Sequence, residues 1–250
     1  GFGLFDLVFE FVAFPLFAYE GPGAVLLRAA AAIVGALQLA LLVAHAGFSP
    51  LHWGLFALLA AAGQWLAWRE HRLAIVPTTS LALSILLMAL WPDPAPIWLA
   101  AIGAALVLIH AVPLLARLWD APPHLRRTLE LCLLALVPPP IVKWQMWGVG
   151  EGALALIAFG AALLPTIGIA RGWRVEGRAS DSRFVWLTGT AAALIALALG
   201  LLLPFWLAPV AIAGVAAALL VFRKVAADRR IEWVGTGFLV IALFELVATP

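Results

Sequence analysis

The sequence predicts an all-α, polytopic integral membrane protein with about ten transmembrane helices arranged in tandem hairpins. Of its 250 residues, 65% are hydrophobic and 11% are charged, and the mean hydropathy is +1.09. A soluble domain carries about a quarter charged residues, so this apolar surface is too large for one water-soluble core. The apolar residues also form successive runs that are long enough to cross about 30 Å of hydrocarbon as helices.

The expected spans follow one another along the whole chain, separated by short turns rich in glycine and proline or by charged loops. They are residues 2–19, 24–46, 51–68, 73–91, 97–118, 125–147, 153–170, 184–203, 205–222 and 231–248. The first segment contains Asp6 and Glu10, so it either spans the membrane or lies at its interface. The prediction is one transmembrane helical domain over residues 1–250.

The connections between these spans alternate in charge. Every second connection is basic, and the remaining connections contain no lysine or arginine. The basic residues are Arg69 and Arg72, then Arg117, Arg126 and Arg127, then Arg171, Arg174, Arg178 and Arg183, and finally Arg223, Lys224, Arg229 and Arg230. Cytoplasmic loops are enriched in such residues, so the pattern places these connections in the cytoplasm, as in a bacterial inner-membrane protein. Residues 171–183 form the longest connection, and we expect it to be the most mobile.

The charge balance and the cysteine content restrict the partners. The net charge is +2 and the isoelectric point is about 9.2, but the basic residues lie in loops whose role in orientation accounts for them. We therefore expect the lipid bilayer as partner and no nucleic acid, with a small-molecule or lipid ligand left open. Cys132 is the single cysteine, which excludes an intramolecular disulfide.

The span at residues 125–147 differs from the others because Pro138, Pro139 and Pro140 interrupt it. Each proline lacks an N–H and disfavours helical geometry at the residue before it. We expect a short extended joint between two helical halves, with the carbonyls of Leu134, Ala135 and Leu136 losing their helical donors. Such groups need shielding by neighbouring helices, because lipid supplies no water to bind them.

Lys143 lies just beyond this break, inside an apolar run, and ionisable groups in spans are functional candidates. We expect its ammonium to point back toward the break and donate to carbonyls near Leu136 and Val137. Glu245, in the outer third of the last span, is the expected counter-ion, with Asp6 and Glu10 as alternatives.

Among the other polar residues of the spans, His110 stands one turn before Pro113, where it can bind a carbonyl that the proline frees. Gln38 and Gln64 can form hydrogen bonds between helices. The sequence contains no HExxH, CxxC, Walker loop or GxSxG, so it predicts no metal, cofactor or catalytic residue.

Two passages carry a resemblance to a known family: residues 68–96, WREHRLAIVPTTSLALSILLMALWPDPAP, and residues 238–250, FLVIALFELVATP. With the Ala/Leu-rich hairpins and the arginine-rich loops, they make the whole chain resemble the domain of unknown function 2339 family, which comprises long polytopic bacterial membrane proteins. The resemblance implies a carboxy-terminal piece of a longer protein. It implies no catalytic residues.

Two functions from different classes fit these features. The interrupted span favours a non-enzymatic role in transport or in the cell envelope, since broken helices recur at the binding sites of transporters. The alternative is a membrane enzyme that acts on a lipid-linked substrate. Such an enzyme needs acidic, histidine or arginine side chains clustered in an outer loop, and the predicted outer turns are short and poor in them.

Overall fold

The computed structural model describes residues 23–248, and within them every regular element is a helix. The predicted span at residues 2–19, with Asp6 and Glu10, lies outside the described residues. The chain divides into two compact units, Gly1–Pro113 and Leu114–Pro250, which are described separately below. The prediction of a single domain remains a prediction.

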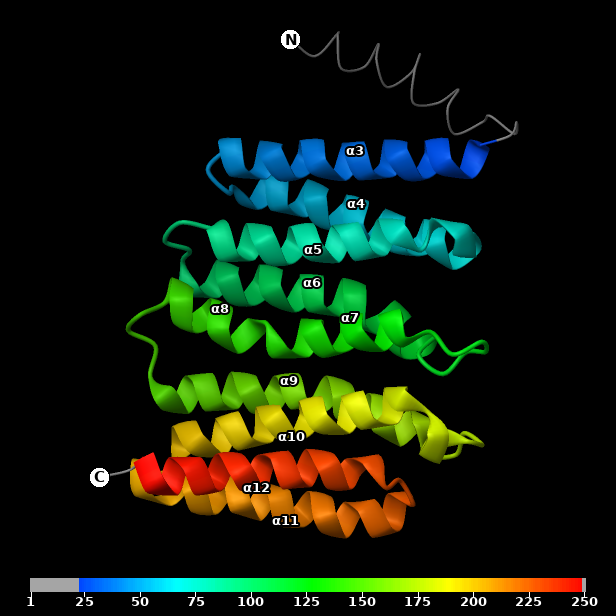
Figure 1. Ribbon diagram of the computed structural model, residues 1–250. Helices are drawn as coiled ribbons and strands as arrows, with labels where there is room; N and C mark the ends of the chain where they lie inside the picture. The colour runs from blue at the N-terminus through cyan, green and yellow to red at the C-terminus, as the bar shows by residue number, and fades with distance from the viewer. Residues whose placement is uncertain (1–22, 249–250) are drawn as a thin grey trace, which may run out of the picture. The chain divides into compact units, whose positions relative to one another are not determined.

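Unit 1 consists of antiparallel helices joined by tight connections (Figure 1). They are α3 (Ala24–His45), α4 (Pro50–Arg69), the 3-10 turn η2 (His71–Leu73), α5 (Ile75–Leu90) and α6 (Pro96–Ala116), whose last turn extends into unit 2. Helix α3 packs against both α4 and α5. Arg28 near the start of α3 forms a 3.4 Å ion pair with Glu70, which places Arg28 beside the α4–α5 connection.

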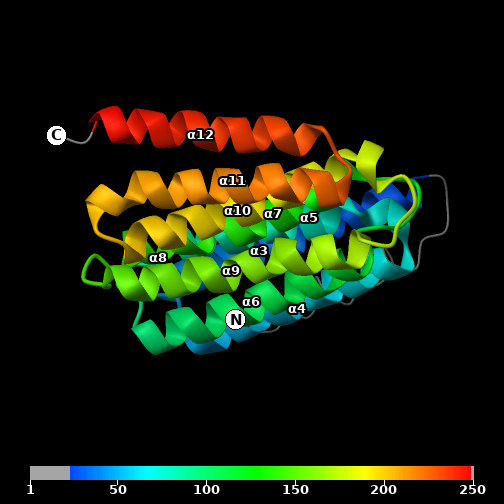
Figure 2. The same ribbon diagram turned by 90° about the horizontal axis from the view of Figure 1, so that it is seen from below.

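Unit 2 is built around one helix, α10 (Ser182–Leu202), and Figure 2 shows it surrounded by other helices. The remaining elements are α7 (Leu125–Leu136), α8 (Pro138–Gln145), α9 (Glu151–Gly172), η3 (Arg178–Ser180), η4 (Phe205–Leu207), α11 (Ala208–Ala226) and α12 (Arg230–Ala248). Helix α10 contacts α7, α9, α11 and α12. Alanines such as Ala192 and Ala198 are buried on it, because small side chains allow helix backbones to approach closely in membranes.

The helix interruption occurs at the predicted place, but its geometry differs from the prediction. Helix α7 ends at Leu136 and α8 begins at Pro138, so one residue, Val137, separates them. Val137 has φ −77° and ψ −36°, which is helical, and no extended joint forms. Three successive prolines fit because the first turn of a helix uses no N–H donors, and α8 begins with them.

Five helical segments are long and apolar enough to cross a membrane: Ala24–His45, Pro96–Ala116, Glu151–Gly172, Ser182–Leu202 and Phe205–Ala226. Many large apolar side chains on them are exposed, for example Leu108, Leu156 and Val221, which is the arrangement expected of helices facing lipid. These helices indicate a membrane protein. Ten spans are not supported by this measure: α5 has only 16 residues, α7 and α8 are short separate helices, and neither α4 nor α12 is among the five.

Close helix packing in unit 2 depends on two glycines of α9 that face the α6–α7 connection. A Cβ at Gly172 would lie 2.1 Å from the ring of Trp119, and one at Gly168 would lie 3.0 Å from Leu118. The indole N–H of Trp119 donates to the carbonyl of Gly168 at 2.9 Å. Gly160, on the same helix, has open space around its Cβ position.

We predict that Gly172→Ala destabilises the protein by about 1–3 kcal/mol, because the new methyl group must displace Trp119 and break its hydrogen bond. Gly160→Ala is the matched control and should leave stability unchanged or raise it, since alanine favours the helix. Thermal unfolding in detergent measures both variants. Equal melting temperatures for the two would contradict the contact.

Candidate functional site

Unit 1 contains a buried polar cluster on three helices, consisting of Gln64 of α4, Ser80 and Ser84 of α5, and His110 of α6. None of the four side chains is more than 9% exposed. The Nε2 of Gln64 lies 2.8 Å from Nδ1 of His110, and Nε2 of His110 lies 3.2 Å from Oγ of Ser84. The cluster therefore connects α4 to α6 and α6 to α5.

The distances define one consistent direction for these hydrogen bonds. The Gln64 amide donates to Nδ1 of His110, whose Nε2–H then donates to Ser84, and the Ser84 hydroxyl donates to the carbonyl of Ser80 at 2.8 Å. This order describes a neutral histidine with both ring nitrogens satisfied. The Ser80 hydroxyl, one turn away, is buried without a hydrogen-bond partner in the described residues.

This cluster corrects the predicted role of His110 and confirms that of Gln64. His110 bonds to two side chains of other helices, in place of the carbonyl that Pro113 frees in its own helix. The His110 ring points from α6 toward α4 and α5, whereas the carbonyl that Pro113 frees, that of Ile109, lies on the backbone of α6 itself. Gln64 forms the interhelical bond that was expected, whereas Gln38 is exposed.

At the α7–α8 interruption, Pro138, Pro139 and Pro140 remove the donors that would bind the carbonyls of Leu134, Ala135 and Leu136. In the described residues no other backbone donor outside the helices reaches these three carbonyls, although Ile141 donates to Val137 at 3.2 Å. The Val137 carbonyl is therefore not free, contrary to the prediction. Leu134 and Ala135 are buried, so their polar backbone lies inside the unit.

The structure does not bring Lys143 to these carbonyls or to Glu245. Lys143 is exposed, and no hydrogen bond or ion pair of its ammonium is found in residues 23–248. Its helix, α8, packs against α7 and α9, whereas α12, which carries Glu245, packs against α10 and α11. The predicted pair is therefore absent from the ion pairs of the described residues, because the two helices have different neighbours.

A second polar network, which sequence reasoning missed, joins the connections at one end of unit 2. The three connections α6–α7, α9–α10 and α11–α12 meet there, and we call this end the basic end. Two of them finish with the same motif, Asp181-Ser182-Arg183 and Asp228-Arg229-Arg230, directly before or at the start of a helix. Aspartate is a favoured helix N-cap, and this signal in the sequence could have identified the motif.

In both motifs the aspartate binds the arginine two residues later through its backbone and its side chain. Oδ1 of Asp181 accepts the Arg183 N–H at 2.9 Å, and its Oδ2 accepts Nε of Arg183 at 2.7 Å. Asp228 binds the N–H and the guanidinium of Arg230 at 3.0–3.1 Å. We call these the Asp-x-Arg pairs.

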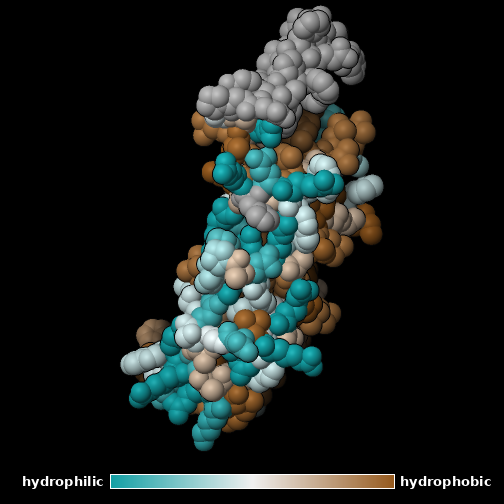
Figure 3. All heavy atoms as spheres, turned by 90° about the vertical axis from the view of Figure 1, so that its right-hand side faces the viewer, coloured by the Kyte–Doolittle hydropathy of each residue, from teal (hydrophilic) through white to brown (hydrophobic). Residues whose placement is uncertain are grey.

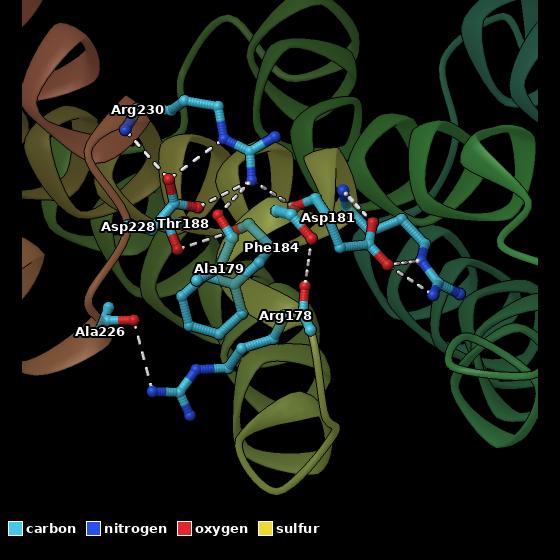
Figure 4. Close-up of polar contacts among 11 residues, drawn as sticks. Arg178, Ala179, Asp181, Phe184, Thr188, Ala226, Asp228 and Arg230 are labelled. Atoms are coloured by element: carbon cyan, nitrogen blue, oxygen red, sulfur yellow. Dashed lines mark hydrogen bonds and ion pairs between the residues drawn. The ribbon is translucent and has the colours of Figure 1, made fainter.

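Each paired arginine then reaches back to the preceding basic connection. Arg183 donates to the carbonyls of Leu118 and Asp120, at 2.7 and 3.4 Å, in the α6–α7 connection. Figure 4 shows Arg230 extending from α12 to the α9–α10 connection, where it donates to the carbonyls of Ala179 and Asp181, both at 3.0 Å. The two pairs thus join three successive hairpins in sequence order.

Arg178 holds the same end together from the α9–α10 connection. Its guanidinium donates to the carbonyls of Trp173 and Ala226 and lies 4.1 Å from the centre of the Trp173 ring. Below it, the rings of Trp173, Phe184 and Phe222 pack within about 6 Å of one another. The connection at residues 171–183, predicted to be the most mobile, is therefore anchored on both sides.

These contacts determine the direction in which the pKa of the Asp181 carboxyl group shifts. Burial raises the pKa of its carboxyl, but the hydrogen bonds of Arg183 and the charges of Arg183 and Arg230 lower it, and the pKa lies below the ordinary 3.8. Asp181 is therefore ionised throughout the physiological range. Its stabilising charge is present above that ordinary value and is lost as the pH falls through the lowered pKa.

The described residues contain no group of three or more His, Cys, Asp or Glu side chains that could hold a metal ion. Comparison with protein-family models, with curated proteins and with solved structures gave no match for this chain. The site must therefore be interpreted from its own geometry.

We predict that Ser84→Ala lowers stability by about 1 kcal/mol, because it removes the acceptor of His110 from a buried network. Ser80→Ala is the control one turn away on the same helix. It should be neutral or stabilising, since the Ser80 hydroxyl is buried without a partner in the described residues. Chemical unfolding of the two variants in detergent gives the comparison, and a larger loss at Ser80 would refute the assignment.

We also predict that Asp181→Asn lowers stability at pH 7 by about 1–3 kcal/mol, because asparagine keeps the helix cap but not the charge that binds Arg183. Acidification from pH 6 to 3 should cost the wild type more than this variant. Glu176→Gln, an exposed acid in the same connection, is the matched control and should change little. If melting temperatures fall equally with pH in the wild type and Asp181→Asn, the Asp181 charge does not act as described.

Proposed function

We propose that this chain is a multi-pass protein of the bacterial inner membrane with a non-catalytic role in transport or in the cell envelope. The observation that carries the proposal is the α7–α8 interruption. It leaves the carbonyls of Leu134, Ala135 and Leu136 without helical donors, and Leu134 and Ala135 are buried inside an apolar helical unit. In transporters, carbonyls freed by a broken helix coordinate ions or line the substrate site.

The surroundings of the break support this use. Helices α9 and α10 both pack against α7, and Ala135 contacts a buried cluster with Ala162 and Leu194. A backbone without internal hydrogen bonds is tolerated at membrane depth only where protein or a water-filled cavity surrounds it. The same reasoning explains why Leu134, Ala135 and Pro139 at the break are buried against neighbouring helices.

The proposed topology has ten spans with both chain ends outside and the basic connections in the cytoplasm. Support comes from unit 2, where the three basic connections are hydrogen-bonded to one another and therefore lie at the same end. We also propose membership of the domain of unknown function 2339 family, on the passages at residues 68–96 and 238–250 and the arginine-rich loops. That family provides no substrate.

The alternative is a membrane enzyme that acts on a lipid-linked substrate. One observation favours it: His110 is part of a buried polar cluster inside an apolar unit, and polar groups at that depth are costly unless they have a role. Against it, both nitrogens of the ring are engaged by Gln64 and Ser84, which leaves neither for a substrate without rearrangement.

Cysteine accessibility tests the proposal. In a Cys132→Ser background, Leu134→Cys at the break should react with a membrane-impermeant cationic thiol reagent, because a transport pathway brings water to these carbonyls. Leu219→Cys, with similar burial on the uninterrupted helix α11, is the matched control and should react at least tenfold more slowly. Gly177→Cys and Pro94→Cys mark the cytoplasmic and outer sides.

Two results would count against the proposal. Equal protection of positions 134 and 219 from both sides of the membrane would exclude a water pathway at the break. Labelling of position 177 from outside intact cells, with position 94 protected, would reverse the orientation.

A further inference from the structure

Helix α9 presents a continuous exposed face that is apolar along its length and ends in two arginines. Leu156, Leu163 and Ile167 are exposed and follow one another at helical spacing. Arg171, in the last turn of α9, is the next exposed residue at this spacing, and Arg174 is exposed in the connection just beyond the helix; both lie at the basic end. Because the apolar part of this face contacts lipid, the two arginines lie where hydrocarbon gives way to headgroups.

Helix α11 repeats the arrangement with a lysine. Val221 and Val225 are 65% and 62% exposed and stand one turn apart, and Lys224 is exposed between them. Because Lys224 stands between two exposed valines, the aliphatic part of its side chain lies on the lipid-facing surface. Its charge can reach the level of the phosphates by extending beyond the end of the helix.

Helix α12 begins in the same way. Arg229 is exposed immediately before the helix, and Trp233, one turn later, is 77% exposed. The exposed face then continues through Val240 and Phe244. Tryptophan prefers the headgroup region of a bilayer, so Trp233 marks the depth at which Arg229 lies.

The cations that the α9–α10 and α11–α12 connections and the adjoining helix ends contribute to the basic end fall into two groups. The inward group binds acids or carbonyls of the protein: Arg178, Arg183, Arg223 and Arg230. The outward group is exposed and forms no ion pair with a carboxylate of the described residues: Arg171, Arg174, Lys224 and Arg229. Arg171 also donates to the carbonyl of Ala116 at 3.5 Å, which uses one of its five N–H donors and leaves the others for a phosphate. Glu176 is exposed in the same region, so the outward surface keeps an excess of positive charge.

From this division we infer that Arg171, Arg174, Lys224 and Arg229 form a binding surface for the phosphates of anionic phospholipids. The argument is charge complementarity, since these cations lie together at one end of unit 2, beside or just beyond exposed apolar side chains suited to acyl chains. In Figure 3, hydrophilic side chains gather over the connections of unit 2. Anionic lipids fit this surface better than zwitterionic ones, because only they carry net negative charge. The inference requires membrane insertion but not a transport role.

The experiment measures lipid binding to the purified protein in neutral detergent by native mass spectrometry. Phosphatidylglycerol should bind at least tenfold more tightly than phosphatidylcholine, and this preference should weaken as ionic strength rises. The quadruple variant Arg171→Gln, Arg174→Gln, Lys224→Gln and Arg229→Gln should lose the preference. Lys224→Gln alone should weaken binding about fivefold, the value expected for one basic residue near a membrane surface.

Lys143→Gln is the matched control, because Lys143 is also an exposed lysine of unit 2 but lies on α8, away from the basic connections. It should bind phosphatidylglycerol as the wild type does. Equal affinity of the wild type for both lipids, or the same loss in Lys143→Gln as in Lys224→Gln, would overturn the inference. Competition by inorganic phosphate at equal concentration would also overturn it, since the site would then be one for a soluble anion. The salt dependence needs only the wild-type protein and so does not rely on any variant folding.

Discussion

Inside a bilayer no water is available to bind a backbone N–H or carbonyl, and this constraint determines most of the architecture. It explains why the described residues form helices joined by short connections, and why α10 carries alanines that let four other helices approach it. It also makes the interruption at Pro138 informative. Carbonyls without helical donors are costly in hydrocarbon, so their place between packed helices calls for a functional explanation.

The basic side chains at the basic end of unit 2 have two roles, which the amino-acid composition alone does not distinguish. Arg183 and Arg230 are held by aspartates two residues earlier and bind the carbonyls of the preceding connection, which links one hairpin to the next. Isolated surface ion pairs contribute little, but these arginines also satisfy backbone carbonyls of the connections, which lie outside the helical hydrogen-bond pattern. The remaining cations face outward beside exposed apolar side chains, where phospholipid phosphates lie.

In the buried cluster of unit 1, polar side chains likewise find hydrogen-bond partners within the protein. His110 has a partner for each ring nitrogen, and the partners come from α4 and α5. Such a network restrains the rotation of three helices about their axes, because turning any one of them would break a hydrogen bond of His110. The Ser80 hydroxyl is the exception among them, and the Ser84 and Ser80 variants therefore separate a bonded hydroxyl from an unbonded one at nearly the same depth.

The sequence by itself determined the helical class, the positions of the helices in the described residues to within a few positions, and the break at Pro138, because hydropathy and proline act locally along the chain. Only the tertiary structure decided that His110 meets Gln64, 46 residues away. It also decided that Gly172 contacts a neighbouring segment whereas Gly160 does not. The same holds for the absence of a pair between Lys143 and Glu245. These contacts depend on which helices are neighbours and how each is rotated about its axis, and neither property is specified by local hydropathy.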